Sequence, residues 1–141
     1  MIDNLDERRA RGRQVVREMF GEKWLAGFEA HISGGGFGAE AGRMALEFAF
    51  AENWGRPGLD RRSRSLVTIG ALIALGKPDE LKNHIRAGFA NGITVEELEL
   101  AIMHAIPYVG FVLGAEALQA ASAVLKERGV EVNDAKDRGI L

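Results

Sequence analysis

The sequence predicts an all-α protein of six to seven helices, and two observations lead to this class. Segments that alternate like β-strands are scarce, whereas glycines and capping residues divide the chain into stretches of helical length. A chain of 141 residues is also long enough for one domain with its own hydrophobic core. We therefore expect a single domain over residues 1–141, with a polar, mobile tail from about 130 to 141.

Three helices are expected in the first half of the chain. The first is charged and runs from about Leu5 to Phe20, and the second covers Lys23 to Ile32. A glycine-rich loop over residues 33–38 precedes the third helix, from Ala39 to about Asn53, which ends before Gly55-Arg-Pro-Gly58. The apolar side chains expected in the core are Val15, Val16, Met19, Phe20, Met44, Leu46, Phe48 and Phe50.

Four further helices are expected in the second half. Asp60 is a suitable N-cap for the first of them, and Pro78 suits the first turn of the next. Thr94-Val-Glu-Glu97 has the spacing of a capping box, so another helix should begin there. The expected ranges are about 61–75, 78–91, 95–106 and 111–128.

The first of these helices is apolar almost all round from Leu66 to Leu75, apart from Thr68. A helix without a polar face has to be covered on several sides. We expect the cover to come from its own domain or from other subunits.

Composition argues against several classes of protein. A net charge of −2 argues against general affinity for nucleic acid or anionic membranes, and no apolar run is long enough to span a bilayer. Without cysteine there is no disulfide, thiolate nucleophile or cysteine metal site, which fits the cytoplasmic location that we expect. The histidines, His31, His84 and His104, lack a metal-binding spacing, so we expect no metal site.

The most informative motif is a carboxylate and an imidazole four residues apart, Glu80 and His84. Such residues are neighbours on one face of a helix. The small or short residues Ala87, Gly88 and Asn91 share that face and would leave room beside the pair. The pair is either an acid/base device or a partly exposed ion pair of little energetic value.

Basic and aromatic residues around the predicted break form a second set of candidates. Arg64, at the start of the apolar helix, is suited to bind a carboxylate bidentately, or it simply extends its charged end to solvent. Trp54 and Arg56 flank the loop and would cover a pocket, unless Trp54 anchors the core.

His104 and Tyr108 form a third set. His104 lies in an apolar helical segment, where a lone histidine is more often a hydrogen-bonded core residue than a catalyst. Tyr108 follows four residues later, but Pro107 between them leaves open whether they share a face.

Taken in order, these motifs resemble the carboxymuconolactone decarboxylase family over nearly the whole chain. The matching segments are Gly21-Glu-Lys23, Trp54-Gly-Arg-Pro-Gly-Leu59, Arg64-Ser-Leu-Val-Thr68, Ala71-Leu-Ile-Ala-Leu-Gly76, Glu80-Leu, His84-Ile-Arg86, Asn91-Gly-Ile-Thr94, His104 and Tyr108-Val-Gly110. The resemblance implies a compact helical fold in trimers or hexamers. The chain departs from the pattern at Phe111–Glu116, which leaves the exact substrate open.

The resemblance also implies an activity. The expected reaction is cofactor-independent decarboxylation of 4-carboxymuconolactone to 3-oxoadipate enol-lactone, a step in protocatechuate breakdown. The alternatives are a same-scaffold enzyme for another lactone or β-keto-type acid, and a non-enzymatic helical oligomer that binds an acidic ligand. The wider family includes alkylhydroperoxidase D-like proteins with a Cys-x-x-Cys pair, but Lys77 and Glu80 stand at those positions here. A cysteine-free chain cannot reduce peroxide through a disulfide.

The resemblance and the chemistry together suggest residue roles. Arg64, with Arg56, would bind the acidic groups of the substrate in the loop that also carries Trp54. His84 would donate the proton with Glu80 orienting it, although His104 is an alternative donor. His104 or Tyr108 would donate a hydrogen bond to the lactone oxygen.

Overall fold

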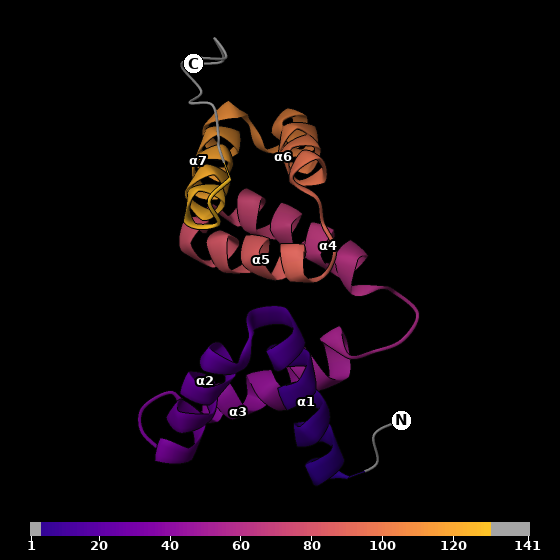
Figure 1. Ribbon diagram of the computed structural model, residues 1–141, viewed down its shortest axis with the longest axis vertical. Coiled ribbons are helices and arrows are strands. Elements are labelled where there is room, and N and C mark those ends of the chain that lie inside the picture. The colour runs from indigo at the N-terminus through magenta and orange to yellow at the C-terminus, as the bar shows by residue number, and fades with distance from the viewer. Residues whose placement is uncertain (1–3, 131–141) are drawn as a thin grey trace. The chain divides into compact units, whose positions relative to one another are not determined.

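The computed structural model describes residues 4–130, and every regular element in that range is a helix (Figure 1). The all-α prediction is confirmed. The chain divides into two compact units, Met1–Arg64 and Ser65–Leu141, and each is described by itself. That the chain is one domain stays a prediction, and the tail expected to be mobile lies outside the described residues from position 131 onward.

The helices begin and end close to the predicted positions. Their bounds are α1 Leu5–Phe20, α2 Glu22–Gly34, α3 Ala39–Met44, η1 Ala45–Trp54, α4 Arg61–Leu75, α5 Pro78–Ala90, α6 Val95–Val109 and α7 Phe111–Glu127. The single helix predicted over 39–53 is divided, because its second part, η1, has the wider turn of a π-helix. Within η1's last turn the Gly55 amide donates to the Phe50 carbonyl at 2.9 Å, five residues back.

The core of the first unit lies between α1, α2 and η1. Val16, Leu25 and Leu46 are its buried centre. Aromatic rings pack against it, and those of Phe20 and Trp24 are stacked with centroids 4.7 Å apart. The rings of Phe28 and Phe50 complete this group with edge contacts. Burial of these apolar surfaces is the main stabilising contribution to this unit.

Two predicted core residues of this unit are on the surface. Met44 is 63% exposed and Phe48 is 70% exposed, whereas Leu46 is buried and Phe50 is partly buried. The two pairs are each spaced by four residues, so each pair occupies one side of the helix. Only the Leu46 side faces α1, so the prediction for Met44 and Phe48 was wrong.

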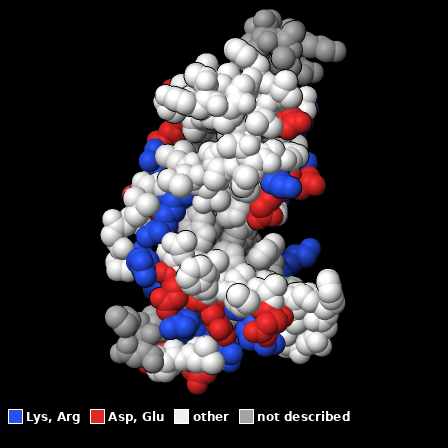
Figure 2. Space-filling model, turned by 180° about the vertical axis from the view of Figure 1, so that it is seen from behind, with Lys and Arg blue, Asp and Glu red and all other residues white. Residues whose placement is uncertain are grey.

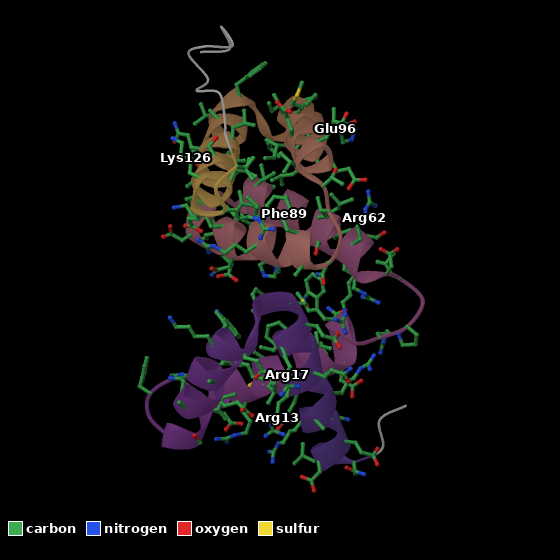
Figure 3. The ribbon with its side chains drawn as sticks, viewed as in Figure 1. Arg13, Arg17, Arg62, Phe89, Glu96 and Lys126 are labelled. Carbon is green, nitrogen blue, oxygen red and sulfur yellow. The ribbon has the colours of Figure 1, made fainter. Side chains whose placement is uncertain are left out.

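Ion pairs join α1 to α2 on the outside of this core. Arg13 and Arg17, labelled in Figure 3, pair with Glu29 and Glu22 respectively. Figure 2 shows acidic and basic side chains interspersed over this unit, so neither sign forms a large field on the face shown. Exposed pairs of this kind contribute little to stability individually.

A glycine permits a close contact between α1 and η1 in the first unit. A Cβ added to Gly12 on α1 would lie 2.4 Å from the Leu46 carbonyl oxygen of η1. We expect Gly12→Ala to lower the free energy of unfolding by about 1–3 kcal/mol, because the backbone of η1 has to move. Urea unfolding followed by tryptophan fluorescence measures the change.

Gly27→Ala is the matched control, because nothing lies within 4 Å of a Cβ added there and the residue is exposed on α2. It should be neutral or stabilise the protein by roughly 0.5–1 kcal/mol, the helix preference for alanine. Equal destabilisation by both substitutions would show that the α1–η1 contact is looser than described.

In the second unit α4 and α5 lie side by side, and α6 and α7 form another pair (Figure 1). The core residues come from all four helices and from the turn before α6. They are Ile69, Ile73, Leu81, Ile85, Ile93, Leu98, Ile102, Ala117, Ala120, Ala121 and Val124. Phe89, labelled in Figure 3, packs against this cluster and lies under the Arg128 guanidinium, 4.8 Å from the ring centroid.

The all-round apolar helix is only partly covered within the described chain. Ile69 and Ile73 of α4 face the core, whereas Val67 and Leu75 are each 67% exposed. The apolar residues Ala71 and Ala74 are exposed as well. One side of α4 therefore remains apolar and accessible.

The predicted caps are present in the second half. Ser63 donates its amide to Asp60 at 2.8 Å, and Thr94 and Glu97 exchange both hydrogen bonds of the capping box. The predicted end of α6 at Ile106 was wrong, because Pro107 lies inside a helix that continues to Val109. A proline in the last turn removes one hydrogen bond without ending the helix. No helix in residues 4–130 is long and apolar enough to cross a membrane.

Candidate active site

The carboxylate–imidazole pair predicted from sequence is formed on α5. Pro78 is at the start of this helix, which places Glu80 in its first turn and His84 one turn later. The two side chains approach at 3.4 Å between His84 Nε2 and Glu80 Oε1. The His84 side chain is only 12% exposed, whereas that of Glu80 is 55% exposed. A shielded imidazole therefore meets a solvated carboxylate.

Burial lowers the pKa of His84 below its ordinary value of 6.5, and the negative charge of Glu80 partly opposes this shift. The imidazole is therefore neutral at pH 7 in the free protein. The unfolded chain takes up a proton first as the pH falls through 6.5, so acidification destabilises the folded state through this residue. An anionic ligand beside His84 would act in the same direction as Glu80 and favour the protonated form.

A chain of hydrogen bonds that the sequence analysis missed holds Glu80 in place. Asn83 donates to Glu80 Oε2 at 3.1 Å and accepts from Arg86 at 3.0 Å. Arg86 in turn binds Glu127 of α7 through two nitrogens, at 3.0 and 2.9 Å. The Arg86 hydrogen bond is the main cause that lowers the pKa of Glu127. These bonds run from the end of α7 to the Glu80–His84 pair.

The small residues on the His84 face are there for helix packing. A Cβ on Gly88 would lie 3.1 Å from Ile93 Cδ1 and 3.5 Å from Ile69 Cδ1. Ala87 is fully buried, and Asn91 donates to the buried Ser65 hydroxyl at 2.9 Å. The expectation that these residues leave room beside the pair was wrong, because α4 and the Ile93 turn fill that space.

The influence of Glu80 on His84 is testable directly. We expect Glu80→Gln to lower the pKa of His84 further, because the substitution removes the charge that opposes the effect of burial. The pH titration of the imidazole resonances by nuclear magnetic resonance gives this pKa in both proteins. Asp79→Asn is the control, since Asp79 lies in the same turn but its carboxylate faces Lys82 at 3.8 Å. An unchanged or raised pKa in Glu80→Gln would contradict the described geometry.

His104 and Tyr108 share a face of α6, which settles the question left open by Pro107. Their ring centroids are 5.7 Å apart with the planes tilted by 54°. Both side chains are exposed, Tyr108 to 80%. His104 is therefore not the core residue that its apolar surroundings suggest, and this pair is available to a ligand or a partner.

The loop between η1 and α4 carries the remaining predicted residues. Trp54 is partly buried at the end of η1, and Arg56 is exposed. Arg64 turns back over the loop and donates to the carbonyls of Leu59 at 2.9 Å and Arg56 at 2.8 Å. Its third contact is a long one, 3.4 Å to the Asn53 side chain. The structure thus brings Trp54, Arg56 and Arg64 into one segment of the first unit.

The predicted residues form three local groups. Glu80 with His84 and His104 with Tyr108 belong to the second unit, and the arginine loop belongs to the first. Within residues 4–130 no group of three or more His, Asp or Glu side chains is placed to hold a metal ion. An open aromatic recess of about 510 Å³ in the first unit contains none of the predicted site residues and is lined by Phe20, Lys23, Trp24, Gly27 and Phe28.

Comparison with known proteins shows that this chain has characterised relatives. The model of the carboxymuconolactone decarboxylase family matches residues 39–127. A 4-carboxymuconolactone decarboxylase from Acinetobacter baylyi is 39% identical over 127 residues, which cover 90% of this chain and 93% of that protein. The nitrosuccinic acid decarboxylase npaB from Metarhizium robertsii is 35% identical over 96 residues, 68% of this chain and 62% of that protein.

Proposed function

The chain belongs to the carboxymuconolactone decarboxylase family, and on this premise we propose that it decarboxylates 4-carboxymuconolactone to 3-oxoadipate enol-lactone without a cofactor. The observation that carries the proposal is the shielded His84 beside Glu80, in a chain similar along nearly its whole length to an enzyme with this activity. The reaction would serve protocatechuate breakdown in the cytoplasm. The lack of cysteine in the sequence is compatible with that location.

The reaction needs few catalytic groups from the protein, because the substrate itself delocalises the electron pair that carbon dioxide leaves behind. The carboxylate that leaves is attached to a ring carbon conjugated through a double bond with the lactone carbonyl. When carbon dioxide departs, the electron pair of the broken bond spreads into that carbonyl as a dienolate. A proton then adds to the carbon next to the carbonyl. The protein has to bind the acidic groups, stabilise the oxyanion and supply that proton.

The described side chains can take these roles. His84 is the proton donor in this proposal, and it draws its proton from solvent between turnovers. Glu80 orients the imidazole and favours its charged form. His104 and Tyr108 are donors for the lactone oxygen, and either side chain is exposed enough to reach a ligand. The acidic groups are assigned to the loop between η1 and α4, which carries Arg56 and to whose carbonyls Arg64 donates.

The test is an ultraviolet assay with purified protein and 4-carboxymuconolactone. Loss of the substrate chromophore without any added cofactor, with carbon dioxide released in equal amount, is the expected result. A protein that leaves the substrate unchanged under these conditions would refute this activity.

A second candidate is decarboxylation of another acid that stabilises its own carbanion. The similarity to a nitrosuccinic acid decarboxylase favours it, because a nitro group also accepts the electron pair left by carbon dioxide. The same assay with nitrosuccinic acid distinguishes the two candidates by their relative kcat/KM.

We also propose that the chain assembles with copies of itself as a trimer or hexamer. Large apolar side chains are exposed where α6 ends and α7 begins, with Tyr108 80%, Phe111 81% and Val112 77% accessible. The upper part of Figure 2, formed by α6 and α7, is mostly uncharged on the face shown. Exposed apolar patches of this kind mark interaction surfaces.

Light scattering after gel filtration should give the mass of three or six chains, and Phe111→Asp should reduce it. A monomer at every concentration in the unmodified protein would contradict this proposal.

A further inference from the structure

The loop between η1 and α4 is held by two arginines that come from opposite directions in the sequence. Arg11 of α1 donates to the Gly55 carbonyl at 3.0 Å. Arg64 of α4 donates to the carbonyls of Arg56 and Leu59 at 2.8 and 2.9 Å. Three backbone carbonyls in one short loop therefore accept from guanidinium groups, and charged donors of this kind form the stronger hydrogen bonds.

Gly55 also contributes to this arrangement of the loop. A Cβ at this position would lie 2.5 Å from the Ala51 carbonyl oxygen and 3.0 Å from Arg11 Nε. A side chain at this position would therefore displace the backbone at the end of η1 and crowd the Arg11 guanidinium. The loop also has a backbone hydrogen bond of its own, because the Arg56 amide donates to the Asn53 carbonyl at 3.1 Å. The Arg56 backbone is thus fixed on both of its polar groups.

The side chain of Arg56 differs from those that hold the loop. It is exposed, and among residues 4–130 its guanidinium is in no hydrogen bond or ion pair. Two Arg64 nitrogens donate to loop carbonyls and a third to the Asn53 side chain of η1, whereas the guanidinium of Arg56 makes no such bond within the described residues. A planar guanidinium with free donors binds a carboxylate bidentately.

We propose that Arg56 is the residue that binds a carboxylate of the substrate, and that Arg11 and Arg64 are positioning residues that hold its loop. The assignment rests on the proposed function for the identity of the acid. It separates the roles of two arginines that sequence analysis had placed together, and it adds Arg11, which sequence analysis did not select. The chemistry recognised is a carboxylate on a small, flat lactone.

The experiment compares Arg56→Gln, Arg64→Gln and Arg11→Gln with Arg43→Gln as control. Arg43 lies on α3 in an ion pair with Glu40, away from the loop in sequence and outside the proposed machinery. Two readouts are needed. Calorimetric titration with muconolactone, which keeps the lactone and one carboxylate but lacks the carboxylate that leaves, gives binding without turnover. Hydrogen exchange of the loop amides gives the order of the loop without any ligand.

Arg56→Gln should weaken muconolactone binding about 10–100-fold, the range for a lost charge-assisted hydrogen bond, and leave loop exchange unchanged. Arg56→Lys should restore part of the affinity. Arg64→Gln and Arg11→Gln should accelerate exchange of the loop amides and weaken binding by less than Arg56→Gln. Arg43→Gln should change neither readout.

The assignment is overturned if Arg56→Gln binds as the unmodified protein does, or if the unmodified protein does not bind muconolactone. It is also overturned if Arg64→Gln abolishes binding without any change in loop exchange, because Arg64 would then be the direct ligand. The proposed function fails separately: a protein that binds muconolactone through Arg56 but leaves 4-carboxymuconolactone intact supports the site and refutes the reaction.

Discussion

His84→Gln should lower the kcat for 4-carboxymuconolactone by about 10²–10⁴-fold, the usual contribution of a positioned proton donor. The KM should change far less, because the acidic groups of the substrate are bound by arginine in this proposal and not by the imidazole. Glutamine keeps much of the histidine volume, so the shielded site on α5 stays filled. Initial rates over a range of substrate concentrations separate the two constants.

Two further variants make this result specific. His31→Gln repeats the same chemical change on α2, at an exposed histidine without a proposed role, and should leave kcat unchanged. His104→Gln tests the alternative donor on α6. If His104→Gln loses turnover and His84→Gln does not, the assignment of the proton to His84 is wrong and the exposed histidine carries the chemistry.

The direction in which kcat/KM changes with pH distinguishes proton donation by His84 from a purely structural role of this residue. If protonated His84 donates the proton, kcat/KM should fall as the pH rises through the pKa of the free protein, which burial places below 6.5. Removing the charge of Glu80 should move that fall to lower pH still. A profile that rises with pH over the same range would identify His84 as a base.

Helix positions were predictable because most of their determinants are local. The hydrogen bonds of Asp60 with Ser63, and of Thr94 with Glu97, join residues three positions apart, so the spacing itself predicts the cap. The Glu80–His84 contact is predictable for the same reason, since four residues make one helical turn. The side of a helix that faces inward is a different question, as Met44 and Phe48 show.

The supporting contacts of the candidate site could not be predicted in this way. Arg11 reaches Gly55 across 44 positions, and Arg86 reaches Glu127 across 41. The local sequence around each arginine does not predict its partner, because the partners become neighbours only through the tertiary packing of the helices. The prediction for Gly88 was wrong for a related reason. A small residue on a helix face is compatible with a cavity or with a close neighbour, and here the neighbours are Ile93 and Ile69 of α4.

Ile102→Ala should lower the free energy of unfolding by about 2–5 kcal/mol, which is large against a typical total of about 5–15 kcal/mol. Ile102 is fully buried in the α6 part of the second unit's core, so the substitution leaves a cavity. Urea unfolding followed by far-ultraviolet circular dichroism measures the change. Leu100→Ala on the same helix is the control. Because Leu100 is 57% exposed, this substitution should lower the free energy of unfolding much less.

The same variant tests the prediction of a single domain. Both tryptophans, Trp24 and Trp54, belong to the first unit, so their fluorescence reports that unit while circular dichroism reports every helix. Helix α4 begins in the first unit and continues into the second, where Ile69 and Ile73 support it. We therefore expect Ile102→Ala to shift the fluorescence and dichroism transitions equally. A fluorescence transition that stays in place while the dichroism transition moves would show two independently folding units, because destabilisation near α6 would then not reach the tryptophans.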